Sequence, residues 1–148
     1  MILISHRGNI DGPTPTRENS KEYITEALKR GFSVEVDVWY LKNELYLGHD
    51  TPEYKINIDF LKNDKIWCHC KNIDAVAFLI QNNVHCFFHQ TDDATLTSRG
   101  YIWIYPGKKL VDNSVCVMPE LGYTGDLQSC TAICSDYIQK YSTIGETK

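Results

Sequence analysis

The strongest constraint on the fold is one segment in which apolar and acidic residues alternate strictly. Val34, Val36 and Val38 share one face of this segment, and Glu35 and Asp37 share the other. Such a period of two predicts a β-strand. A central strand of an open parallel sheet is covered on both sides and is apolar on both faces. A strand that is apolar outward and charged inward instead suits a barrel with a polar pit at the C-terminal ends of its strands.

Short apolar runs alternate with helical or turn-rich segments along the 148-residue chain. We expect a single domain over residues 1–148, of the α/β class: a reduced TIM-like (β/α) barrel with about seven main parallel strands, closed or incompletely closed. Barrels of this kind typically have roughly 250 residues, so one βα unit is expected to be missing. The seven main predicted strands cover residues 2–5, 33–39, 65–70, 84–89, 101–105, 114–118 and 131–134, and a short strand over 44–48 continues from the second of them. Helices are predicted over 20–30 and 74–81, and a turn or short helix over 91–98.

Composition excludes several classes of protein. A net charge of −4 provides no basic field for duplex nucleic acid, so we expect a small-molecule partner. No apolar run approaches the roughly 18 residues that a transmembrane helix needs. The first residues lack the basic and long apolar regions of a secretory signal. With six cysteines interpreted as reduced thiols, we expect a cytoplasmic protein.

The acidic face of the alternating strand points to a metal. The rise per residue places the carboxylates of Glu35 and Asp37 about 6–7 Å apart. Like charges this close raise each other's pKa unless a cation lies between them, and a hard divalent cation takes oxygen ligands. The alternative is an edge strand with a solvated face, and the pair alone does not decide between the two.

Other candidate residues lie where predicted strands end. His6 and Arg7 follow the first apolar run, and His49 follows the short strand over 44–48. Histidine transfers protons near neutral pH, and arginine binds phosphate through two hydrogen bonds. A strand that simply ends in a surface histidine is the alternative for each. His89 and Glu120 also follow apolar runs, as residues that either line a site or are merely solvated.

A zinc site at Cys68-His69-Cys70 is disfavoured. Alternation places both thiols on the face opposite His69, whereas zinc motifs usually separate their cysteines by two to four residues. His69 instead shares its face with Lys71.

The order of the motifs is more specific than any one of them. The chain contains His-Arg-Gly at 6–8, Glu-Asn-Ser at 18–20, Glu-Val-Asp-Val at 35–38 and Gly-His-Asp at 48–50. This order and spacing resemble the glycerophosphodiester phosphodiesterase family of the phosphatidylinositol-phospholipase-C-like TIM-barrel superfamily. The resemblance covers residues 4–50 and continues more loosely at 67–72 and 132–138.

The resemblance implies metal-dependent hydrolysis of a glycerophosphodiester-like small molecule. It implies His6 and His49 as the acid/base pair, Arg7 and Lys71 as phosphate ligands, and Glu35 and Asp37 as ligands of Mg²⁺, Mn²⁺ or Ca²⁺. Glu18 and Asn19 would support the first loop, with His89 and Glu120 as further supporting residues.

His69 stands where the family has an acidic ligand. We expect it either to complete the metal set or to hydrogen-bond one of the carboxylates. The alternative function, from another class, is a catalytically silent module that binds phosphate or a phosphodiester on the same fold.

Overall fold

The structure is a computed structural model that describes residues 1–144. Over this range the chain forms one ten-stranded mixed sheet. The strands are β1 (Ile2–His6), β2 (Ser33–Leu41), β3 (Glu44–Leu47), β4 (Tyr54–Ile56), β5 (Ile66–Cys70), β6 (Cys86–Phe88), β7 (Ala94–Leu96), β8 (Ile102–Ile104), β9 (Ser114–Val117) and β10 (Ala132–Ser135). The helices are α1 (Lys21–Lys29), α2 (Ile58–Leu61) and α3 (Ile73–Gln81), with short 3₁₀ helices η1 (Pro119–Leu121), η2 (Leu127–Ser129) and η3 (Ile138–Tyr141).

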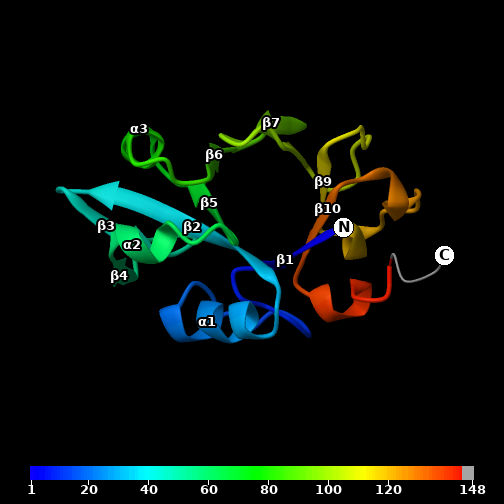
Figure 1. Ribbon diagram of the computed structural model, residues 1–148, viewed down its shortest axis with the longest axis horizontal. Coiled ribbons are helices and arrows are strands. Elements are labelled where there is room, and N and C mark those ends of the chain that lie inside the picture. Colours follow the sequence, from blue (N-terminus) through cyan, green and yellow to red (C-terminus); the bar gives the residue numbers. More distant parts are fainter. Residues whose placement is uncertain (145–148) are drawn as a thin grey trace.

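The sheet curves into a half-barrel (Figure 1). Its parallel part runs in the order β6, β5, β2, β1, β10, β9, β8. The hairpin partner β3 extends antiparallel from β2, and β4 extends antiparallel from β3. At the other end, β7 pairs antiparallel with β8. The first strand therefore lies in the middle of the sheet, beside the last one.

The predicted TIM-like (β/α) barrel is wrong. The sheet is mixed, and within residues 1–144 an α-helix by itself makes only the crossovers from β1 to β2 and from β5 to β6. The segment predicted as a turn or short helix over 91–98 contains β7 instead. Only residues 105–113 join β8 to β9, whereas a crossover through a helix usually takes a dozen residues or more. The second half of the chain is therefore too short for the alternation that a (β/α) barrel requires.

The two faces of β2 differ as the alternation predicts. Its valines pack in a buried cluster with Ile24 and Ala27 of α1 and with Ala75 and Leu79 of α3. Both helices start at side-chain caps, in which Ser20 accepts a hydrogen bond from the backbone of Tyr23, and Asn72 accepts one from that of Ala75. The carboxylates of β2 face the concave side of the sheet.

The concave side is apolar at its base and polar at its mouth. A second buried cluster fills the base, with Ile4, Trp67, Phe87, Trp103 and Val115 among its members. Above it lie the ionisable side chains at the C-terminal ends of the parallel strands. In residues 1–144, no helix has the length and apolar character needed to cross a membrane.

Candidate active site

Most of the predicted site residues line one pocket of about 360 Å³ at the mouth of the half-barrel. Strand register explains the gathering, because β1 pairs His6 with Glu35 of β2, and β5 pairs His69 with Asp37. In adjacent parallel strands, such partners lie side by side on one face. The lining residues are His6, Arg7, Glu35, His49, His69, Lys71, His89, Gln90, Trp103, Tyr105, Pro106 and Val117.

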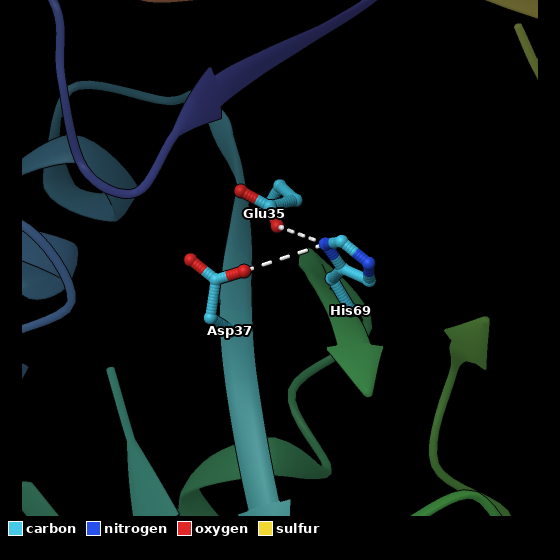
Figure 2. Close-up of side chains that lie close together, drawn as sticks. All are labelled: Glu35, Asp37 and His69. Carbon is cyan, nitrogen blue, oxygen red and sulfur yellow. Dashed lines mark ion pairs between the residues drawn. The ribbon is translucent and has the colours of Figure 1, made fainter. Parts of the chain in front are cut away.

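Glu35, Asp37 and His69 form the candidate metal set (Figure 2). Each offers one ligand atom, and these atoms lie within 4.8 Å of one another. The Nδ1 atom of His69 is 3.3 Å from Oδ1 of Asp37 and 3.7 Å from Oε1 of Glu35. The side chains of Glu35 and Asp37 are only 1% and 0% exposed, so water cannot compensate their charge.

Unsatisfied atoms in this set fit a divalent cation. Oε2 of Glu35 and Oδ1 of Asp37 are buried and accept no hydrogen bond from the residues that the structure describes. The other ring nitrogen of His69, Nε2, lies 2.8 Å from the carbonyl oxygen of His89. Because a carbonyl only accepts, Nε2 carries a proton, and Nδ1 is the ring nitrogen that faces the carboxylates. Two carboxylates and an imidazole that converge in this way suit Mn²⁺ or another divalent ion.

Asp37 is surrounded by cationic and hydrogen-bonding groups. Its Oδ2 lies 3.0 Å from Nε of Arg7 and accepts a 2.9 Å hydrogen bond from the Asn19 amide. The Asn19 amide oxygen in turn accepts from the backbone N–H of Asp37. Burial raises the pKa of Asp37, but the adjacent His49 and His69 side chains and the charge of Arg7 outweigh burial and hold the pKa well below its usual value. Asp37 is therefore ionised.

His6 is oriented by a carboxylate that the sequence analysis did not assign to the site. Its Nδ1 lies 2.7 Å from Oδ1 of Asp136, which follows β10, and its Nε2 lies 3.7 Å from Oε2 of Glu35. Burial lowers the pKa of His6, but the Asp136 hydrogen bond and the charge of Glu35 outweigh it, and the pKa is raised. The pairing of Ser5 with Ser135 places Asp136 beside His6, so only strand order could have revealed it.

His49 reaches the pocket from the end of β3. Its Nδ1 lies 2.7 Å from the NH2 nitrogen of Arg7 and 3.4 Å from Nζ of Lys71. Since arginine can only donate, Nδ1 accepts, and the proton of the neutral ring is on Nε2. The ring is 42% exposed, so substrate can reach it.

The first loop contains contacts of Glu18 and also of Asn9, which the sequence analysis missed. Glu18 lies 3.4 Å from the Arg7 guanidinium and accepts a 2.8 Å hydrogen bond from Asn9. The same Asn9 amide nitrogen donates to Asp136 at 2.8 Å. Asn9 is completely buried and links the carboxylate that contacts Arg7 to the one that orients His6.

The remaining predicted residues are peripheral. His89 lines the pocket, and its ring contacts the backbone oxygen of Asp92. Glu120 is not among the lining residues of the pocket in the described chain; it accepts hydrogen bonds from the Ser135 hydroxyl and the Asp136 backbone. The thiols of Cys68 and Cys70 are buried in the apolar cluster that also contains the valines of β2. They do not face His69, so these three residues do not form a zinc site.

No protein-family model, curated protein or solved structure matches this chain. The functional argument therefore rests on the geometry of the pocket.

Proposed function

We propose that this protein is a metal-dependent phosphodiesterase that acts on a small phosphodiester. One observation carries the proposal: two histidines with fixed ring orientations border a buried carboxylate pair, in a pocket that also holds an arginine and a lysine. Paired histidines suit proton transfer to and from two substrate oxygens. The cations suit an anionic substrate, in a protein whose net charge is −4.

Glu35, Asp37 and His69 would hold Mg²⁺, Mn²⁺ or Ca²⁺. When bound, a divalent ion neutralises negative charge on phosphoryl oxygens. Arg7 and Lys71 would bind the same oxygens from the mouth of the pocket. Arg7 is already oriented by Asp37 and Glu18, so little of its side-chain freedom remains to be lost on binding.

The histidines would transfer protons through their Nε2 atoms, because Nδ1 of each is held by another residue. One histidine removes the proton of a substrate hydroxyl as that oxygen bonds to phosphorus. The other protonates the leaving oxygen as its bond to phosphorus breaks, which gives an alcohol and a cyclic phosphodiester. In the second half, water opens the ring with the two proton transfers reversed.

The free cysteines and the pocket volume support two further parts of the proposal. All six cysteines are free and buried in the described chain, which supports a cytoplasmic location. A volume of about 360 Å³ also suits a small molecule.

The test is hydrolysis of glycerophosphodiesters, whose free hydroxyl can attack phosphorus, with Mg²⁺, Mn²⁺ or Ca²⁺. We expect His6→Ala and His49→Ala each to lower kcat by about 10²–10⁴. His49→Ala should leave the melting temperature nearly unchanged, because the His49 ring is 42% exposed. His85→Gln is the matched control, since His85 lies outside the pocket and bonds Thr97. Near wild-type kcat in either alanine variant would refute the acid/base assignment. Phosphate binding without turnover on any substrate would identify a silent binding module instead.

A further inference from the structure

The wall of the pocket opposite the carboxylates has a different chemistry. Trp103 and Tyr105, from β8 and its end, line this wall together with Pro106 and Val117. None of these four side chains carries a charge, whereas the opposite wall carries Arg7, Glu35 and Lys71. In the parallel order, β8 is separated from β2 by β1, β10 and β9, so the two walls face each other across the half-barrel.

Ring stacking fixes the orientation of Trp103 in the aromatic wall. The ring of Trp103 stacks on Phe87 with centroids 4.4 Å apart, and Phe87 stacks on His69 at 5.0 Å with planes 9° apart. The metal set and the aromatic wall are therefore joined through one stack of rings. Such rings keep their orientation without help from a ligand, which lowers the entropy cost of binding against them.

Tyr105 is the accessible part of this wall. It is 46% exposed, one of eight large hydrophobic side chains that the described chain leaves open to solvent. Its ring meets the His89 ring edge-on at 5.5 Å. An exposed aromatic residue at the rim of a pocket has apolar surface to lose when a ligand binds.

We infer that one substituent of the phosphodiester is an uncharged aromatic or apolar group that packs against Trp103 and Tyr105. This inference rests on the proposed function, because it places the phosphate at the ionic wall. A polyol would leave its hydroxyls unpaired against this wall. A cationic group can contact the faces of the two rings, but it would meet no carboxylate among the described residues that form the wall. With about 360 Å³ in all, the pocket suits a phosphate and one ring-sized group.

The experiment compares three phosphate monoesters, which bind without turnover: phenyl phosphate, glycerol 3-phosphate and choline phosphate. Calorimetric titration with Mn²⁺ present should show phenyl phosphate binding about tenfold more tightly than the other two. Tyr105→Ser should reduce that preference severalfold. Tyr46→Ser is the matched control, because Tyr46 lies on β3 outside the pocket and bonds Glu44, and it should leave the preference intact.

The outcomes separate this inference from the proposed function. Equal affinities for the three monoesters, or tighter binding of the glycerol or choline ester, overturn the inference. The proposed function still stands in that case if the protein hydrolyses a diester. A preference that survives both Tyr105→Ser and Trp103→Leu also overturns it. If no monoester binds and no diester is hydrolysed, both fail together.

Discussion

At the scale of single residues, His69 uses its two ring nitrogens for different contacts. Nε2 donates to the His89 carbonyl, and Nδ1 faces Asp37 and Glu35. Burial lowers the pKa of His69, but the two adjacent carboxylates, Asp37 and Glu35, outweigh it and raise the pKa to about 9. A proton and a metal ion therefore compete for Nδ1 through the neutral pH range.

This competition predicts a pH-dependent metal affinity. Since the proton must leave before Nδ1 can bind a metal, Mn²⁺ affinity should rise with pH and level off near pH 9. His69→Glu should remove most of this dependence in that range and shift the preference toward Mg²⁺ or Ca²⁺, because a glutamate ionises at about pH 4.3. Calorimetric metal titrations across neutral and alkaline pH measure both effects, with His89→Gln as the control. An unchanged metal ranking and pH profile in His69→Glu would exclude His69 as a ligand.

Asn9 is a positioning residue for the proposed reaction. Its amide nitrogen donates to Glu18 and Asp136 at 2.8 Å each, and these carboxylates contact Arg7 and His6. Replacing the amide with an apolar group of similar size would leave two partly buried carboxylates without a shared donor.

We expect Asn9→Leu to lower kcat by roughly 10–100-fold. The matched control is Asn57→Ala, which removes the side-chain cap of α2 and should cost about 0.5–2 kcal/mol of stability without changing kcat. Steady-state kinetics and thermal unfolding of both variants give the comparison. If the two variants lose stability equally and both keep wild-type kcat, Asn9 is structural only.

At the scale of elements, the turn after β3 places His49. Gly48 has φ +151°, and its carbonyl oxygen accepts a 2.7 Å hydrogen bond from the Trp39 indole. A Cβ atom at Gly48 would overlap the carbonyl oxygen of Thr51, so the backbone next to His49 would have to move. The turn therefore requires glycine for steric as well as conformational reasons.

Gly48→Ala should therefore lower kcat/KM by about as much as His49→Ala, roughly 10²–10⁴-fold. Metal affinity should change little, because Glu35, Asp37 and His69 lie on other strands. Gly100→Ala is the control: its φ is +83°, but a Cβ there meets nothing within 4 Å. Parallel measurements of activity and metal binding decide the matter, and equal activities for the two variants would contradict this role of the turn.

At the scale of the whole molecule, folding buries two carboxylates in one region, and their negative charge must be balanced by nearby cationic groups. Glu35 and Asp37 are buried, and Arg7, Lys71, His6 and His69 surround them. A cation that binds only the folded state adds stability through linkage. The metal should therefore be visible in unfolding experiments even without turnover.

Mn²⁺ at about 100 times its Kd should stabilise the protein by about 2.7 kcal/mol, which corresponds to roughly 5–10 °C in Tm. The double variant Glu35→Gln/Asp37→Asn should lose this shift. Glu53→Gln/Asp59→Asn, which changes two exposed carboxylates, should keep it. Thermal unfolding with and without the metal tests this. A full shift in the first double variant would place the metal elsewhere.

Local pattern by itself determined much of this protein. The strict alternation around Glu35 and Asp37 set which face of β2 is apolar and which is acidic, because strand periodicity needs no tertiary information. That both faces are buried followed only from the fold. Helix caps and apolar spacing likewise located α1 and α3. Motif order and parallel strand ends indicated that these carboxylates would lie close to His6 and His69.

Tertiary structure alone decided the rest. The half-barrel arises because the second half of the chain connects its strands through β7, loops and 3₁₀ turns, and local periodicity does not specify which strands will become neighbours. The pairing of β1 with β10 brings Asp136 to His6 across 130 residues of sequence. The proton position on His69 is set by a backbone carbonyl twenty residues away. Contacts between distant segments depend on which strands lie side by side in the sheet, and no local sequence signal specifies that arrangement.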